Sequence, residues 1–387
     1  MKIVADANIP FVKDCFSSIG KVVTIPGRRI SAEVAGDADV LLVRSVTNVD
    51  EGLLSGSRVR FVGTATIGFE HVDRGYLEER GVGFASAPGS NANSVAEYIV
   101  AALLSVARKR KIRLAGRSIG IVGVGNVGSR VEKKVKALGM KAVLNDPPLQ
   151  RATGDAKYVA LEEVFGCDFV TLHTPLTFEG ADSTFHLADE SFFKSLKDGC
   201  VFLNTSRGGV VDTAVLKDAI DVGRLGGVVL DVWENEPNID VELLRRVDLS
   251  TPHIAGYSFD GKVAGVMMLY DAVCKYFGLE ATKTIEDFLP EPQVPELRIS
   301  DETCRGQDVQ EIIHQMVQQV YAINRDDFNT REIATVPESE RGSFFDDLRK
   351  DYPVRREFQN TTVILPRGCA ELAEKLRGIG FMVRYES

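Results

Sequence analysis

The sequence predicts an α/β fold with two parallel-sheet units and a separate C-terminal α+β appendage. Short apolar or β-branched runs alternate with helical segments between residues 119 and 253, and a second alternation occupies the N-terminal part. Such alternation is typical of parallel sheets with crossover helices. Pro290, Pro292 and Pro295 then indicate a linker, because closely spaced prolines forbid regular structure and stiffen a connection.

The predicted elements follow the chain in order. Residues 94–107 are apolar on nearly every side, which predicts a buried helix that bridges the two units. The N-terminal unit has predicted strands at residues 2–6, 21–26, 39–45, 60–65 and 82–88 and a helix at 70–80. The larger unit has predicted strands at residues 119–125, 142–146, 168–174, 200–206, 227–232 and 248–254. The appendage has predicted helices at residues 308–323 and 369–379 and strands at 361–365 and 381–386.

Length and composition exclude several classes of protein. A chain of 387 residues is too long for one core, so we expect two or three domains. The net charge of −9 argues against a nucleic-acid partner, and the basic run at residues 108–113 is interpreted as a solvated helix end. No apolar run approaches the roughly 18–20 residues that span a bilayer, and Asp6 interrupts any signal peptide. We expect a cytoplasmic protein with no membrane partner.

The six cysteines lie far apart in the sequence, and no two of them form a C-x-x-C motif. This spacing suggests neither a zinc site nor a disulfide framework. We therefore expect reduced, mostly buried thiols and no bound metal.

Residues 119–139 carry a dinucleotide-binding signature. Gly123, Gly125 and Gly128 have G-x-G-x-x-G spacing directly after an apolar strand and at the start of a helix. The first glycine permits a tight turn, the second lets the backbone approach a pyrophosphate, and the third lets helix and strand pack closely. Asp146 ends the next strand, where a carboxylate accepts hydrogen bonds from both ribose hydroxyls and repels a 2′-phosphate. The motif favours NAD over NADP, although Arg151 lies close by.

Three polar residues, Arg207, Glu236 and His253, follow successive later strands, on the side where open α/β sheets bind ligands. Oxidation of a 2-hydroxy acid needs a cation for the carboxylate, a base for the hydroxyl proton and a hydride acceptor. Arginine suits the first task because its planar fork pairs with a carboxylate. Histidine suits the second because it titrates near working pH, and Glu236 is expected to orient it.

The motifs together resemble the D-isomer-specific 2-hydroxyacid dehydrogenases over roughly residues 1–285. The matching segments are VGVGNVG, HTPLT, LNTSRGGVVD, DVWENEP and TPHIAG. The resemblance implies two Rossmann-like or flavodoxin-like domains with the active site in the cleft between them. It implies a discontinuous substrate-binding domain at residues 1–93 and 254–288, an NAD-binding domain at 94–253 and a C-terminal dimerisation domain at 289–387.

The resemblance also assigns roles to single residues. It makes Arg207, Glu236 and His253 the catalytic residues. The positions expected to bind NAD lie in the glycine loop and after later strands, and they are Gly123, Gly125, Asn126, Val127, Gly128, Asp146, Thr174, Thr205, Ser206, Arg207, Asp231 and Gly256.

The segment VGTATIGFEHVD, residues 62–73, sets small and hydroxyl-bearing residues where a strand is expected to end. The resemblance assigns substrate binding to Ser45 and Thr66, with Tyr257 as a further contact, and Arg44 is a candidate to balance a phosphate. The alternative is that the threonines of this segment only fill a pleated strand. His71, in the same segment, is interpreted as structural support of the turn.

Within the family, this segment and the length of the appendage resemble a subgroup that acts on a phosphorylated 2-hydroxy acid as a homodimer. Two alternatives stay open. The substrate is another D-2-hydroxy acid such as 3-phosphoglycerate, or the chain is a non-catalytic NAD-sensing regulator on the same scaffold. The lack of disordered tails disfavours a regulator.

Overall fold

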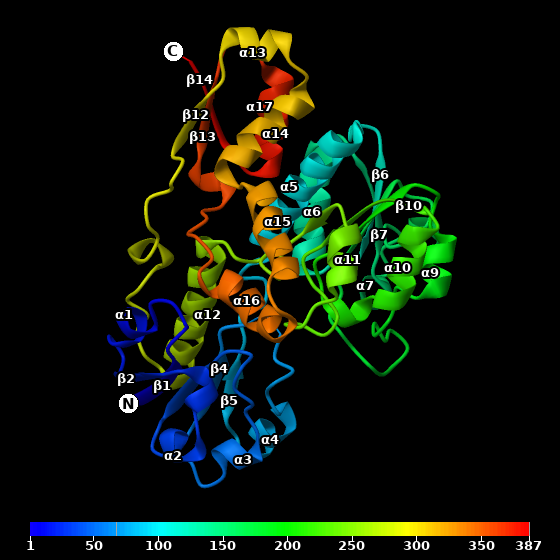
Figure 1. The fold of residues 1–387 in the computed structure, drawn as a ribbon. Coiled ribbons are helices and arrows are strands. Elements are labelled where there is room, and N and C mark those ends of the chain that lie inside the picture. Colours follow the sequence, from blue (N-terminus) through cyan, green and yellow to red (C-terminus); the bar gives the residue numbers. More distant parts are fainter. Residues whose placement is uncertain (67, 387) are drawn as a thin grey trace. The chain divides into compact units, whose positions relative to one another are not determined.

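The computed structural model describes residues 1–66 and 68–386, and the chain forms two compact units (Figure 1). Unit 1 comprises Met1–Asn91 and Ser258–Glu291, and unit 2 comprises Ala92–Tyr257 and Pro292–Ser387. All paired strands are parallel within the described ranges, so the predicted α/β class is confirmed. The division into three domains with the boundaries given above stays a prediction.

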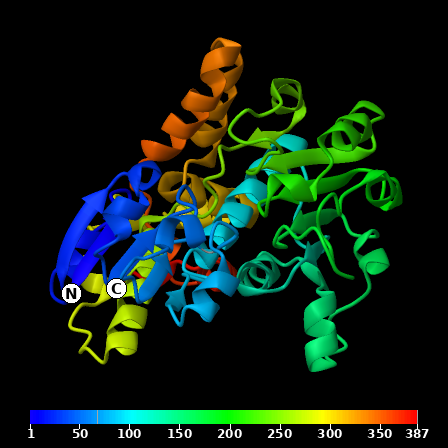
Figure 2. The same ribbon diagram turned by 90° about the horizontal axis from the view of Figure 1, so that it is seen from below.

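Unit 1 contains a five-stranded sheet in the order β2-β1-β3-β4-β5. Helix α12 comes from the second segment and packs against one face of this sheet (Figure 2). Ile3 and Ala5 of β1 belong to the core on that face, and Val4 belongs to a second core on the other side. The strands are β1 (Lys2–Asp6), β2 (Lys21–Ile25), β3 (Val40–Val43), β4 (Phe61–Thr64) and β5 (Gly83–Ala85). The helices are α1 (Val12–Phe16), α2 (Ala32–Ala35), α3 (Glu51–Leu54), α4 (Arg74–Glu79) and α12 (Phe259–Phe277).

Unit 2 contains a six-stranded sheet in the order β11-β10-β9-β8-β6-β7. The strand order reverses between β6 and β8, and ligands of open α/β sheets bind at the carboxyl ends of strands beside such a reversal. The strands are β6 (Ser118–Val122), β7 (Lys141–Asn145), β8 (Phe169–Leu172), β9 (Cys200–Asn204), β10 (Leu225–Leu230) and β11 (Leu249–Ser250). The helices beside them are α6 (Asn126–Ala137), α7 (Pro147–Thr153), α8 (Leu161–Val164), α9 (Glu190–Ser195), α10 (Thr213–Asp221) and α11 (Val241–Arg246).

Helix α5 (Ala92–Arg110) is the buried helix that the sequence predicts. Every residue from 94 to 104 is buried, as the apolar composition of all its faces requires. The helix packs against α6 on one side and against the C-terminal helices on another, so that α5 and α6 lie between the six-stranded sheet and those helices (Figure 1). The C-terminal part of unit 2 therefore shares a core with its first part.

The C-terminal part carries a third sheet, in the order β12-β13-β14. Strand β12 lies in the predicted linker and was missed there, because it starts directly after Pro295 and is short. A proline is tolerated at that place since β12 is an edge strand. The strands are β12 (Glu296–Arg298), β13 (Thr362–Leu365) and β14 (Met382–Tyr385). The helices are α13 (Asp301–Gly306), α14 (Val309–Val320), α15 (Ile323–Arg331), α16 (Glu338–Lys350) and α17 (Ala370–Ile379).

A disulfide joins Cys304 of α13 to Cys369, the residue before α17, with their Cα atoms 6.6 Å apart. The expectation of reduced thiols is therefore wrong for this pair. The two cysteines are 65 residues apart, and the pairing of β12 with β13 and the packing of α14 on α17 connect their segments. The four other cysteines are free and buried, as expected, and they are Cys15, Cys167, Cys200 and Cys274.

None of the described helices is long and apolar enough to cross a membrane. Within the same ranges, no three His, Cys, Asp or Glu side chains gather as a group that could hold a metal ion.

Candidate functional site

The glycine loop follows β6 and leads into α6. Gly123 has φ +87°, and a Cβ there would lie 2.8 Å from the backbone of His173. A Cβ at Gly128 would lie 2.1 Å from the carbonyl oxygen of Gly123, so neither position tolerates a side chain. At Gly125, by contrast, a Cβ would meet nothing within 4 Å, and this glycine caps α6 without a side-chain hydrogen bond. Open space in front of uncapped helix amides fits a pyrophosphate.

Asp146 lies at the end of β7, beside the glycine loop. Its Oδ2 accepts a hydrogen bond from Val124 N–H at 2.8 Å, and its Oδ1 accepts one from Leu149 N–H at 2.9 Å. A carboxylate oxygen has two acceptor positions, so both oxygens can still accept ribose hydroxyls. Arg151, the residue that left room for NADP, forms an ion pair with Asp182. This geometry fits NAD.

The other residues expected to bind NAD lie after β8, β9 and β10. The hydroxyl of Thr174 is buried and has no hydrogen-bond partner among the residues that the structure describes, which fits a contact to a ligand. The hydroxyl of Thr205 lies 3.2 Å from Nδ1 of His173, and that of Ser206 donates to Asn204 Oδ1 at 2.7 Å. Desolvation lowers the pKa of His173 to about 3, so this ring is neutral.

Asp231 is fully buried and holds the loop that bears His253 and Gly256. Its carboxylate accepts hydrogen bonds from the hydroxyl of Thr251 and from the N–H groups of Ile254 and Ala255, at 2.7, 2.7 and 3.0 Å. Its backbone carbonyl also accepts a bond from His253 N–H at 2.7 Å. Asp231 thus shapes the site through this loop.

The three predicted catalytic residues follow neighbouring strands of one sheet. Arg207 follows β9, Glu236 follows β10 and His253 follows β11, and these strands are adjacent in the order β11-β10-β9. His253 has φ +58°, a conformation that is uncommon for a residue with a side chain and that the hydrogen bond from its N–H to the Asp231 carbonyl helps to maintain. Nη1 of Arg207 donates to the Ser206 carbonyl at 2.9 Å.

Glu236 and His253 form a dyad. Nδ1 of His253 lies 2.7 Å from Oε2 of Glu236, while Oε1 accepts the N–H of Trp233 at 2.8 Å. Burial acts to raise the pKa of Glu236, but the charge and hydrogen bond of His253 and the bond from Trp233 outweigh it and lower that pKa. Glu236 is therefore ionised, and it fixes the imidazole with Nδ1–H toward itself. Nε2 of His253 has no partner among the described residues and remains available as a base.

A second histidine–glutamate pair, formed by His186 and Glu234, was not predicted from the sequence. Nε2 of His186 lies 2.8 Å from Oε1 of Glu234, and its Nδ1 lies 3.7 Å from Asp212. Oε2 of Glu234 accepts the N–H of Thr213 at 3.2 Å. The ordering of Glu234 and Glu236 along the chain gives no sign that they face different histidines.

The predicted substrate contacts fall in both units. Ser45, exposed, and the half-buried Arg44 follow β3 in unit 1, and Tyr257 is the last residue of the first segment of unit 2. In the segment of residues 62–73, the hydroxyl of Thr64 lies 2.6 Å from that of Thr66 and 2.9 Å from Nε2 of His71. This agrees with the structural role expected for His71. Residue 67 lies outside the described residues.

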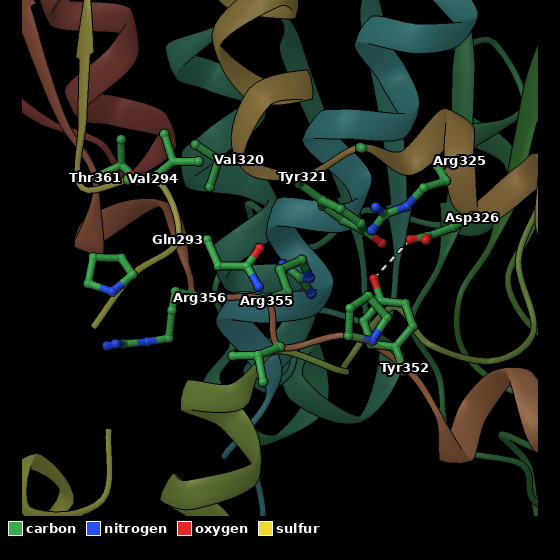
Figure 3. A pocket seen from close by; sticks show the side chains of 14 residues that line it. Gln293, Val294, Val320, Tyr321, Arg325, Asp326, Tyr352, Arg355, Arg356 and Thr361 are labelled. Carbon is green, nitrogen blue, oxygen red and sulfur yellow. Dashed lines mark hydrogen bonds between the residues drawn. The ribbon is translucent and has the colours of Figure 1, made fainter. Parts of the chain in front are cut away.

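A cavity of about 460 Å³, open mouth included, lies in the C-terminal part of unit 2 (Figure 3). Tyr321, Asp326, Tyr352 and Arg355 line it, and Tyr352 donates a hydrogen bond to Asp326 at 2.8 Å. None of the predicted site residues lines this cavity. It is therefore separate from the Glu236–His253 dyad.

Comparison with known proteins places the chain in a family. Residues 95–255 match the family model described as D-isomer specific 2-hydroxyacid dehydrogenase, NAD binding domain, and residues 288–380 match a domain of unknown function. Erythronate-4-phosphate dehydrogenases of Escherichia coli strain ATCC 8739 and of Shigella flexneri are both 42% identical over 382 residues, covering 98% of each chain.

Solved structures show the same fold. The TT0316 protein from Thermus thermophilus gives a TM-score of 0.64 at 25% identity, covering 73% of this chain and 99% of that one. D-lactate dehydrogenase from Aquifex aeolicus, in complex with NAD and lactic acid, gives 0.58 at 24% identity, covering 72% of this chain and 96% of that one. The full-length identity to curated relatives decides the assignment: the chain belongs to the erythronate-4-phosphate dehydrogenases, within the D-isomer specific 2-hydroxyacid dehydrogenase family.

Proposed function

We propose that this chain oxidises 4-phospho-D-erythronate to (R)-3-hydroxy-2-oxo-4-phosphooxybutanoate with NAD, a step in pyridoxal 5′-phosphate (vitamin B6) biosynthesis. One observation carries the chemistry: the ionised Glu236 holds Nδ1 of His253 at 2.7 Å and leaves Nε2 available. The substrate follows from the name that the curated relatives bear, which are 42% identical over 98% of this chain.

Each of the three catalytic residues has a separate role in the reaction. Arg207 binds the substrate carboxylate and polarises the carbon–oxygen bond, because its guanidinium is a permanent bidentate donor. Nε2 of His253 takes the hydroxyl proton, and the resulting imidazolium is stabilised by Glu236. The nicotinamide ring, when bound, supplies the acceptor for the hydride that leaves C2. In the reverse direction the imidazolium of His253 returns the proton to the product oxygen.

The contacts to substrate and partner are part of the same proposal. Ser45, Thr66 and Tyr257 bind the substrate, and Arg44 helps to balance its phosphate. The enzyme is a cytoplasmic homodimer, and residues 289–387 contribute to the dimer interface. Light scattering on the intact chain tests the oligomeric state, since removal of the C-terminal part would cut through the core that it shares with α5.

The substrate is tested with purified protein, NAD and each candidate acid, while the absorbance of NADH at 340 nm is followed. We expect strong preference for 4-phospho-D-erythronate. Preference for 3-phosphoglycerate would reject the proposed substrate but keep the chemistry. Binding of NAD without turnover of any acid would instead favour a non-catalytic NAD-sensing regulator.

A further inference from the structure

The segment from α16 to Glu357 packs against the loop that follows the catalytic histidine. The ring of Tyr352 meets that of Tyr257 edge-on, with centroids 5.9 Å apart, and the guanidinium of Arg349 lies 5.8 Å from the Tyr257 centroid. Nη2 of Arg355 donates to the carbonyl of Ala255 at 3.4 Å. All these residues belong to unit 2. The C-terminal part thus contacts Tyr257, four residues after His253.

Arg349 is a cation with an unsatisfied hydrogen-bond donor among the described residues. Its Nε is buried and has no hydrogen-bond partner within the described part of the chain. Its ion pair with Asp346, one turn earlier on α16, is long at 3.5 Å. The side chain is 29% exposed, so the guanidinium is neither sealed in the core nor free in solvent. A half-buried arginine with an unpaired donor is suited to a further anionic partner.

Arg349 interacts electrostatically with the dyad. Burial acts to lower its pKa, but Tyr257, Glu236 and Asp346 raise it, so the group is charged. Arg349 in turn helps to lower the pKa of Glu236. The ring of Phe345, 5.8 Å from the guanidinium, forms an apolar floor beside it. Arg349 therefore lies against Tyr257, a residue proposed to contact the substrate, and interacts electrostatically with Glu236 of the dyad.

The substrate class requires such a cation. A phosphorylated 2-hydroxy acid carries a carboxylate at one end and a phosphate at the other, only a few bonds from the reacting carbon. Arg207 is assigned to the carboxylate. The fork of a second guanidinium matches the geometry of a phosphate. Arg355 also has unpaired donors in the described part of the chain, but its side chain is only 4% exposed and lies 3.6 Å from Glu97, with which it interacts electrostatically.

We propose that Arg349 binds the phosphate group of the substrate, so that the C-terminal part of the chain determines specificity for phosphorylated acids. This inference rests on the function proposed above and adds a residue to it. It also gives the domain of unknown function, matched at residues 288–380, a direct role in substrate recognition.

The test compares 4-phospho-D-erythronate with D-erythronate, which lacks the phosphate. In Arg349→Gln we expect kcat/KM for the phosphorylated acid to fall by about 30- to 100-fold, the usual effect of losing hydrogen bonds to a charged group. The kcat/KM for D-erythronate should change by less than about threefold. Arg349→Lys should recover part of the loss because it keeps the charge. Lys350→Gln removes the neighbouring charge from an exposed side chain and should leave both values unchanged.

The outcomes separate the two proposals. A wild-type enzyme that does not turn over 4-phospho-D-erythronate overturns the proposed function, and this inference with it. An active wild type whose preference for the phosphorylated acid persists in Arg349→Gln overturns this inference alone. So does a loss of preference in Arg44→Gln with none in either Arg349 variant. Equal losses for both acids in Arg349→Gln, with a lowered melting temperature, would show that Arg349 only supports the fold.

Discussion

Unit 2 contains two histidine–glutamate pairs that are nearly identical in local geometry. His253 lies 2.7 Å from Glu236, and His186 lies 2.8 Å from Glu234. Both histidines have positive φ, +58° and +51°, and both glutamates accept a backbone N–H with their second oxygen. Their side chains are also similarly exposed, at 33% and 30%. By distance and exposure, either pair qualifies as an acid–base dyad.

The two pairs differ in which imidazole nitrogen is not bonded to the glutamate. His253 uses Nδ1 for Glu236, and Nε2 remains available at the carboxyl end of the sheet. His186 uses Nε2 for Glu234, while Asp212 lies 3.7 Å from its Nδ1 and the ring stacks on Phe185 at 4.0 Å. A base needs an unshared lone pair that faces its substrate. A short histidine–carboxylate distance therefore does not identify a catalytic residue by itself.

The largest effect is expected when each histidine is replaced by asparagine, a residue that tolerates positive φ. We expect His253→Asn to lower kcat/KM by about 1,000-fold, the usual contribution of a general base, while NADH binding measured by fluorescence changes little. His186→Asn is the matched control and should keep kcat/KM within about threefold, since no reacting group faces it. Equal losses in the two variants would contradict the assignment of His253 as the catalytic base.

The next test replaces the carboxylates. Glu236→Gln should lower kcat by about 100-fold, because a neutral amide neither fixes the tautomer of His253 nor stabilises its imidazolium. The lowered pKa of Glu236 means that this loss should persist throughout the neutral pH range. Glu234→Gln makes the same isosteric change in the His186–Glu234 pair and is the matched control. A decrease in its kcat comparable to that of Glu236→Gln would contradict the assignment.

A third histidine of unit 2, His173, differs from the other two because its hydrogen-bond partners are hydroxyls and not carboxylates. His173 lies 3.1 Å from Thr171 and 3.2 Å from Thr205, and desolvation lowers its pKa from the ordinary 6.5 to about 3. Below pH 6.5 the unfolded chain therefore binds a proton that the folded chain does not bind until about pH 3. Folding stability from this group is complete above pH 6.5 and falls as the pH is lowered.

For the NAD-free protein, we expect the wild type to lose about 1–2 kcal/mol more unfolding free energy than His173→Gln between pH 7.5 and 5. Urea denaturation at the two pH values measures this difference. The same pH dependence in both proteins would show that the folded state protonates His173 as readily as the unfolded chain.

The smallest expected effect is the contribution of the His186–Glu234 pair to the stability of the fold. His186→Asn should lower the free energy of unfolding at pH 7 by no more than about 1 kcal/mol, since a histidine–carboxylate contact with this exposure contributes little. Thermal denaturation of the variant and the wild type measures the change. A loss of several kcal/mol would mean that the pair supports the turn around Phe185 far more than its exposure suggests.

The parts of the fold that the sequence predicted well have local signals. The glycine loop, the buried helix α5 and most strands of the two larger sheets follow from short-range patterns, and the dyad follows from residues after neighbouring strands. The missed features depend on long-range pairing. Strand β12 is three residues long and gains its partner β13 from more than sixty residues later, and the Cys304–Cys369 disulfide likewise joins residues 65 positions apart.

In the site, too, the sequence predicted the features with local signals and missed those that depend on packing. The motif that holds Glu236 also holds Glu234, and alternation along a loop does not say which carboxylate faces which histidine. Arg349 lies in the mostly polar helix α16 and belongs to no motif, and only the packing of α16 on Tyr257 identifies it as a candidate. The sequence assigned Asp146 to a ribose, whereas the structure adds that it also holds Val124 of the glycine loop.

The sheet made from the first 85 residues has a consequence for synthesis. One of its two faces is covered by α12, whose residues Val263, Leu269 and Tyr270 belong to the same apolar core as Ile3 and Phe61. On the ribosome, that face stays uncovered until the chain has grown past Phe277, after all the strands of the second sheet have been made. This sheet therefore completes its core only after the strands of the second sheet have been synthesised.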